Sequence, residues 1–436
     1  MSKSANERRS LIPWLLSDRD CFGRALTHRC PCANCHRMKK LSSPALTVVL
    51  GLIALSASAT DWPHFRGPDY NGISKESGWS TQWPANGPKK LWSAKVGIGF
   101  ATISVNEGRA YTVGHADKKD TIFCFDANTG TAVWKHSYAA ELDPKYYEGG
   151  PSATPTVEGG RVYTLSKRGV VHCLDAAKGT AIWSKNLAEE VKATMPTWGF
   201  AGSVFISGDL AVFNVGSTGA ALDKKSGKVV WSSGPDEAGY STAVPFAAAT
   251  GPAVMLALKQ EVAAVQVQDG KELWRFPWKT QYEVNAADPI RSGNQVFISS
   301  GYNRGGGLFD VSSNPPKNLW DNKNMRNHMN SCVLWKGHLY GVDENQLRCL
   351  VFATGEVKWT DKASGKGSLI LVDGKLIVLS EKGELLVAEP SPEGFKPLSR
   401  AQILGGKCWS APVLANGKLY ARNAAGDVVC VNVSRE

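Results

Sequence analysis

The chain has 436 residues, enough for a sizeable core, and a formal net charge of +11. Residues 1–59 hold nine basic and three acidic side chains, which leaves 41 basic and 36 acidic residues in the remainder. That near balance, with no basic run after residue 59, argues against nucleic-acid binding. No apolar stretch after residue 59 is long enough to span a membrane.

The N-terminal segment has the organisation of an export signal with an extra piece in front. Residues 1–37 show no strand pattern, and Met38 then opens a basic start followed by the apolar run Leu46–Leu55. Ala57-Ser-Ala59 is typical of a cleavage site. We expect residues 1–37 to be an artefact of gene prediction, residues 38–59 to be a signal peptide, and the mature protein to be periplasmic or secreted. A long, genuine signal segment is the alternative.

Cys32-Ala-Asn-Cys35-His36 matches the attachment motif of c-type haem. Haem is attached after export, whereas this motif precedes the expected export signal and lacks a surrounding helical domain. No second ligand pair follows at the spacing of a zinc finger. We therefore predict neither haem nor zinc here.

Residues 60–88 form a lead-in to the rest of the chain. They contain Trp62, Trp79 and Trp83 among prolines and glycines, including the stretch Asp61-Trp-Pro-His-Phe-Arg-Gly-Pro68. Such a composition favours an ordered strap that packs over the following domain instead of a free linker. We expect this strap to act as a structural cover.

An eleven-residue pattern, Cys124-Phe-Asp-Ala-Asn-Thr-Gly-Thr-Ala-Val-Trp134, returns along the chain. Short apolar runs around an Asp/Asn/Thr/Gly cluster predict a hairpin, with glycine at a positive-φ position and aspartate bonding its own backbone. The tryptophan is expected to pack between neighbouring sheets and to donate its indole N–H to a backbone carbonyl. The other close copies begin at Cys173, Ala221, Ala264 and Cys349.

The spacing of the repeat predicts the fold. The equivalent tryptophan positions are 92, 134, 183, 231, 274, 320, 359 and 398, the last held by leucine, so the period runs from 39 to 49 residues. Four strand-length runs per period indicate propeller blades. Leu91–Val96 lacks partners before it, while the C-terminal end supplies only three strands, ending in Val428–Val433. We predict an all-β, eight-bladed propeller over residues 89–436, with four-stranded antiparallel blades and a ring closed by the N-terminal strand.

The repeat resembles the tryptophan-docking repeat of pyrroloquinoline quinone (PQQ) dehydrogenases. It is also similar to that of the propeller lipoprotein of the outer-membrane barrel-assembly machinery. The resemblance covers residues 61–436 and implies an eight-bladed propeller. It leaves the function open, because enzymes and non-catalytic scaffolds share this fold.

Six cysteines follow the signal segment, and four of them occupy the same repeat position: Cys124, Cys173, Cys349 and Cys430. Equivalent positions on different blades are expected to be further apart than the roughly 7 Å that a disulfide tolerates between Cα atoms. We therefore predict buried free thiols instead of disulfides.

The loops that enter the innermost strand of each blade all open on one face of a propeller, at one end of its central channel. In this chain those loops are rich in aromatic and polar residues, a composition typical of a ligand pocket. The alternative is that the polar groups only satisfy backbone at the channel mouth. The candidate ligand-binding residues are Glu148, Trp198, Tyr240, Asn285, Asp288, His328 and Trp409.

The resemblance implies two functions for such a mouth. In a PQQ dehydrogenase the cofactor would lie on Trp198 or Trp409, and Glu148, Asn285 and Asp288 would offer oxygens to Ca²⁺. None of these residues matches a family motif position, so no catalytic residue and no metal ligand is assigned. The blades also lack long insertions and an adjacent Cys-Cys pair.

The favoured alternative is a binding or scaffold propeller of the cell envelope. It would hold an envelope protein, a polysaccharide or a small ligand at the mouth. We expect it to be a monomer.

Overall fold

The computed structural model describes residues 59–435. The expected extension, residues 1–37, and all but the last residue of the expected signal segment, 38–59, lie outside the described residues. The described part is almost entirely β, with one short helix, α1 (Leu187–Glu190). Within it, no helix has the length and apolar character needed to cross a bilayer.

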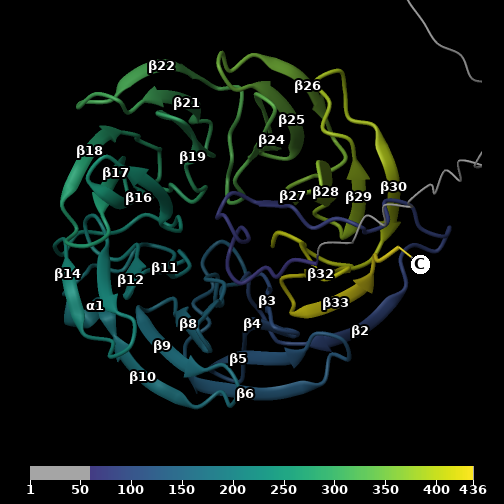
Figure 1. The fold of residues 1–436 in the computed structure, drawn as a ribbon, viewed down its shortest axis with the longest axis horizontal. Helices are drawn as coiled ribbons and strands as arrows, with labels where there is room; N and C mark the ends of the chain where they lie inside the picture. Colours follow the sequence, from purple (N-terminus) through teal and green to yellow (C-terminus); the bar gives the residue numbers. More distant parts are fainter. Residues whose placement is uncertain (1–58, 436) are drawn as a thin grey trace, which may run out of the picture. The chain divides into compact units, whose positions relative to one another are not determined.

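Apart from one short added strand, the strands form eight antiparallel four-stranded blades that follow one another around a ring (Figure 1), as predicted. Blade 1 is β3 (Ser104–Asn106), β4 (Arg109–Ala116), β5 (Lys119–Asp126) and β6 (Ala132–Ala139). Blade 2 is β7 (Thr156–Glu158), β8 (Arg161–Leu165), β9 (Val170–Asp175) and β10 (Ala181–Asn186). Blade 3 is β11 (Phe205–Ser207), β12 (Leu210–Phe213), β13 (Ala220–Asp223) and β14 (Val229–Ser232). Blade 4 is β15 (Val244–Ala248), β16 (Gly251–Ala257), β17 (Glu261–Gln266) and β18 (Glu272–Pro277).

The second half of the ring repeats this order from the innermost strand outwards. Blade 5 is β19 (Ile290–Ser292), β20 (Gln295–Ser300), β21 (Gly305–Asp310) and β22 (Lys317–Asn322). Blade 6 is β23 (Val333–Trp335), β24 (His338–Asp343), β25 (Gln346–Val351) and β26 (Val357–Asp361). Blade 7 is β27 (Ser368–Val372), β28 (Lys375–Leu379), β29 (Glu384–Ala388) and β30 (Pro397–Gln402), with β1 (Ile73–Ser74) added in parallel to β27. Blade 8 is β31 (Val413–Ala415), β32 (Lys418–Arg422), β33 (Asp427–Asn432) and β2 (Lys90–Lys95).

The N-terminal strand closes the ring, as the unmatched ends of the sequence predict. β2 pairs antiparallel with β33, and Trp92 lies opposite Cys430. A buried arginine on β32, Arg422, ties blade 8 to blade 1 by donating to the carbonyls of Ala101 and Val113 at 2.9 and 2.7 Å. β2 thus supplies the missing fourth strand of blade 8, and the edge of β33 is paired and not exposed.

Six of the seven docking tryptophans donate their indole N–H to the turn of the next blade, as predicted. The indole of Trp92 donates to the Ala127 carbonyl at 3.1 Å, and a Cβ on Gly130 would lie 2.6 Å from the same ring. Gly130 has a φ of +72°, so the turn needs glycine for its backbone conformation as well as for space. The indole-to-carbonyl bond recurs at Trp134, Trp183, Trp231, Trp320 and Trp359.

The small residue that opens each repeat lies directly opposite the tryptophan of its own blade. Cys124 pairs with Trp134 on one side and with Tyr111 on the other. An alanine or cysteine leaves room for two flanking aromatic rings, which explains why this position stays small. All six cysteines of the described residues are buried free thiols, as predicted.

Blade 7 differs from the prediction that Leu398 takes the tryptophan position. The bulge that marks this position on the other blades falls between Val387 and Ala388, and Val387 lies opposite Ser399. Ser399 therefore holds the position, and Leu398 is an exposed neighbour. The four-residue spacing from glycine to tryptophan fails here because Val387 and Ser399 are twelve positions apart, whereas Cys124 and Trp134 are ten apart, so the loop before β30 is two residues longer.

The lead-in, residues 60–88, crosses the centre of the ring in Figure 1, where it is drawn in purple. We call it the strap. Trp62 forms an antiparallel bridge with Val105 of β3, and the Pro63 carbonyl accepts the amide of Val157 on β7. Further along, the Gly72 carbonyl accepts an amide from β27. The strap thus covers the free inner edges of several blades at the end of the channel opposite the incoming loops.

A belt of side-chain hydrogen bonds joins the blades where their innermost strands begin. In each link, a backbone N–H of one blade donates to a hydroxyl or carboxylate oxygen of the next blade, over 2.8 to 3.0 Å. The accepting residues are Thr154, Ser203, Thr242, Asp288 and Ser331. Between blades 8 and 1 the direction reverses, because the Thr102 hydroxyl donates to the Ala411 carbonyl at 2.7 Å.

Replacing a docking tryptophan is expected to destabilise the ring. Trp231 is only 9% exposed and donates to the Val267 carbonyl at 2.8 Å. We expect Trp231→Ala to lower the free energy of unfolding by about 3–5 kcal/mol in a urea titration, as for other buried aromatics. Its neighbour Val230 is 47% exposed, so Val230→Ala should change stability by no more than about 0.5 kcal/mol. Equal losses for the two variants would contradict the docking role.

The strap should make the fold sensitive to acid. His64 stacks on Tyr70 with ring centroids 3.7 Å apart, and burial lowers its pKa to about 4. Because the unfolded chain binds this proton first, the stability that neutral His64 contributes is complete above about pH 6.5 and is lost as the pH falls towards 4. His64→Phe keeps a ring against Tyr70 but removes the titration. The difference in urea midpoint between pH 7 and pH 4.5 should be smaller in this variant, and an unchanged difference would refute the assignment.

Candidate functional site: a blind funnel at the mouth of the channel

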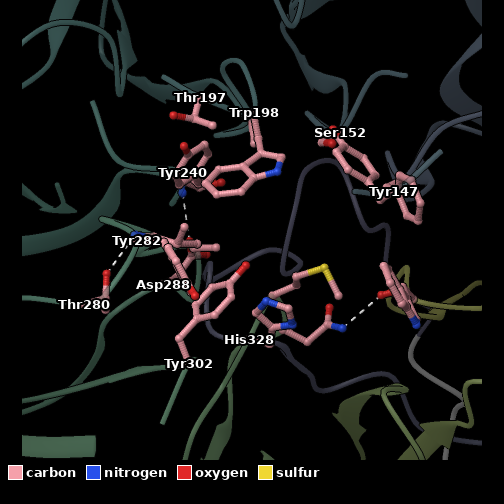
Figure 2. A pocket seen from close by; sticks show the side chains of 18 of the residues that line it. Tyr147, Ser152, Thr197, Trp198, Tyr240, Thr280, Tyr282, Asp288, Tyr302 and His328 are labelled. Atoms are coloured by element: carbon pink, nitrogen blue, oxygen red, sulfur yellow. Dashed lines mark hydrogen bonds between the residues drawn. The ribbon is translucent and has the colours of Figure 1, made fainter. Parts of the chain in front are cut away.

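A cavity of about 960 Å³ lies at the end of the channel where the chain enters the innermost strands. We call it the funnel. Loops of all eight blades contribute to its wall, from Phe100 before β3 to Trp409 before β31. Figure 2 shows these side chains directed towards one shared space. Its volume lies in the range of pockets that bind small molecules or short chains.

The strap closes the inner end of the funnel. Phe65 belongs to the funnel wall, and the adjacent Arg66 donates to the Cys332 carbonyl at 2.9 Å. Arg66 also lies 3.8 Å from the Asp288 carboxylate, and both side chains are buried. Burial raises the pKa of Asp288 to about 6 against the opposing effect of Arg66, so the carboxylate is ionised at neutral pH.

Two groups of aromatic side chains line the funnel. On the side of blades 3 to 6, Trp198 and Tyr240 meet edge to face at 6.0 Å, and Tyr302 lies 4.7 Å from His328 (Figure 2). On the side of blades 8, 1 and 2, Phe100 contacts both Tyr147 and Trp409, at 5.4 and 5.8 Å. Hydrogen bonds fix both tryptophans, because the Trp198 indole donates to the Lys145 carbonyl and that of Trp409 donates to Glu381.

Five of the seven candidate residues from the sequence line this cavity: Trp198, Tyr240, Asp288, His328 and Trp409. Glu148 and Asn285 do not belong to its wall. Glu148 pairs with Lys407 at 2.6 Å, and the fully buried Asn285 donates to the carbonyls of Leu258 and Trp278. A ligand-binding role for any of the seven remains a prediction.

His328 lines the funnel and, within the described residues, has one buried, unpaired ring nitrogen. Its Nδ1 atom is buried and has no hydrogen-bond partner within residues 59–435. Burial and then the nearby Lys366 ammonium lower the pKa of His328, so the imidazole is neutral at pH 7. Because Nδ1 is shielded from solvent, the imidazole contributes its ring surface to the funnel wall.

Several wall residues were not predicted from the sequence. Tyr302 and Gln260 come from loops between the second and third strands of their blades. In an antiparallel blade, those loops open on the same face as the loops that enter the innermost strands. This rule of topology could have placed both residues at the funnel from the sequence alone. Phe65 was missed because nothing in the sequence places the strap inside the channel.

The wall residues do not form the ligand set that a PQQ–Ca²⁺ site requires. Of the three proposed oxygen donors, only Asp288 lines the funnel, and it is already engaged by Arg66 and by the Thr242 amide. Within residues 59–435, no group of three or more His, Cys, Asp and Glu side chains is placed to hold a metal ion.

The eight blades, the docking tryptophans and the loop-lined funnel define the class of β-propellers built from PQQ-type repeats. A family model described as "Outer membrane protein assembly factor BamB" matches residues 118–361, more than half of the chain. The chain belongs to this family. No curated protein sequence matches it significantly.

Solved structures agree with the fold. BamB from Moraxella catarrhalis is 16% identical, with a TM-score of 0.58, and the match covers 80% of this chain and 98% of that one. A europium-containing methanol dehydrogenase is 12% identical, with a TM-score of 0.63 over 83% and 89% of the two chains. The quinohemoprotein alcohol dehydrogenase from Comamonas testosteroni is 13% identical, with a TM-score of 0.61 over 88% and 82%. At these identities the likeness concerns the fold alone.

Proposed function

We propose that this protein is an exported binding module of the cell envelope that holds a ligand or a segment of a partner in its funnel. The observation that carries the proposal is the funnel itself, a blind cavity of about 960 Å³ with aromatic walls built by all eight blades. The family described as an outer-membrane assembly factor supports an envelope role. Such a module binds and positions its partner without chemical change.

The alternative, a PQQ dehydrogenase, has less support. The similarity to two alcohol-oxidising enzymes concerns the fold, and their chemistry does not transfer at 12–13% identity. PQQ bound with Ca²⁺ would supply an electrophilic quinone for oxidation. In this chain two of the three oxygen donors proposed for Ca²⁺ are directed elsewhere, so we derive no reaction step through that cofactor.

Site-specific crosslinking in cells tests the binding role. Tyr146 is 94% exposed beside the funnel, so a photo-reactive benzoylphenylalanine in its place should capture the bound partner. The same group at Lys178, in an exposed turn of blade 2 on the opposite face, is the matched control. Trp198→Ala combined with the Tyr146 probe should reduce the yield about fivefold or more, as for a binding hot spot.

Two results would contradict the proposal. One is equal crosslinking from positions 146 and 178, since the funnel would then have no special role. The other is Ca²⁺-dependent binding of PQQ with dye-linked oxidation of alcohols or sugars, which would establish the dehydrogenase instead.

Export is a separate prediction. We propose that residues 1–37 are absent from the mature protein, that residues 38–59 are removed, and that the strap (60–88) and propeller (89–436) remain. Mass spectrometry of the native protein should find an N-terminus near Thr60. Peptides from residues 1–37 in the envelope fraction would refute this processing and raise the net charge of the mature chain.

A further inference from the structure

The funnel has an excess of positive charge. Its two acidic wall residues are each paired with a cation: Asp288 with Arg66 at 3.8 Å, and Glu283 with Lys259 at 3.0 Å. Lys259 also pairs with Glu237 at 3.4 Å, so these five groups together carry one net negative charge, which the two lysines of the wall exceed. Its two lysines, Lys145 and Lys366, make no ion pair within the described part of the chain. A negatively charged ligand is therefore favoured over a neutral or positively charged one.

The two lysines are each associated with an indole of the wall. The Lys145 ammonium donates to the carbonyl of Thr197, the residue before Trp198, at 3.4 Å, and the Lys366 ammonium lies 5.7 Å from the ring centroid of Trp409. These tryptophans belong to the two different aromatic walls. Positive charge and an aromatic surface thus occur together on both sides of the cavity.

The wall also offers neutral hydrogen-bonding groups between the rings. The side chains of Thr197 and Gln281 make no hydrogen bond within residues 59–435. Aromatic faces suit the C–H faces of sugar rings, and hydroxyl and amide groups suit sugar hydroxyls. A ligand with many hydroxyl groups would satisfy these unused groups together.

We infer that the funnel binds an acidic glycan, a sugar chain that carries carboxylate or sulfate groups. The inference rests on the proposed binding function and specifies its ligand. Lys145 and Lys366 bind the acidic groups, and Trp198 and Trp409 stack on sugar rings. An extended peptide fits less well, because the strap already pairs with the inner edges of β3, β7 and β27 that β-strand addition would need.

Calorimetric titration of the purified protein with short oligosaccharides tests the inference. The probes are oligogalacturonate, which carries carboxylates, a sulfated dextran oligomer, and uncharged dextran of the same length. We expect binding of at least one acidic probe, weaker binding at high salt, and no binding of uncharged dextran. The two acidic probes distinguish a carboxylated from a sulfated ligand.

Single substitutions connect binding to the funnel. Lys145→Gln and Lys366→Gln should each weaken binding of the acidic probe about tenfold, the loss expected for one charged hydrogen bond. Lys178→Gln is the control, because Lys178 is an exposed lysine remote from the funnel. Melting curves of the three variants should coincide with that of the parent, since no ion pair is lost.

Three outcomes would overturn the inference: no binding of either acidic probe, binding that both lysine substitutions leave unchanged, or tighter binding of a polyglutamate peptide of equal charge. Crosslinking from position 146 separates this failure from that of the proposed function. A funnel that captures a partner but binds no acidic glycan remains a binding module with another ligand. A funnel that does neither loses both assignments.

Discussion

The ring depends on the contact between a tryptophan of one blade and the turn of the next. A single blade cannot bury its two apolar faces by itself, so it must pack on both neighbours at a fixed spacing and angle. Trp134 provides one, since its indole donates to the Ala176 carbonyl at 2.9 Å while Gly179 leaves the space that a Cβ would fill at 2.5 Å from the ring. Repetition of this contact sets a constant step from blade to blade, and the belt fixes the blades again near the axis.

The exception in blade 7 follows from the same contact. Blade 8 is assembled from both ends of the described chain, so no turn connects β33 to β2 and a tryptophan at Ser399 would have no turn to contact. The strap occupies this place instead. A Cβ on Gly87 would lie 2.7 Å from Ala401, and Trp83 packs on the core cluster of blades 7 and 8. The missing tryptophan of blade 7 therefore follows from the missing turn of blade 8.

Periodic features of the sequence predicted the fold, and non-periodic ones limited the prediction of the site. The glycine-to-tryptophan spacing repeats, so the blade number and the pairing of Leu91–Val96 with Val428–Val433 followed from counting. Side-chain direction within a loop has no such repeat. Asn285 therefore resembled an oxygen donor at the mouth, yet it donates to buried carbonyls. Asp288 is part of the belt and also pairs with Arg66. Both contacts join residues far apart in the sequence, so the sequence alone did not predict them.

The closed floor constrains how a polymer can be recognised. With Phe65 and Arg66 across the inner end, nothing threads from one face of the propeller to the other, and every ligand enters and leaves by the same opening. A long chain can therefore insert only its terminus, while its interior stays outside. Such a geometry responds to the number of chain ends in solution and not to total polymer mass. Cleavage of one polymer into many fragments would raise the number of chain ends that can enter the funnel, while the total mass of polymer stays the same.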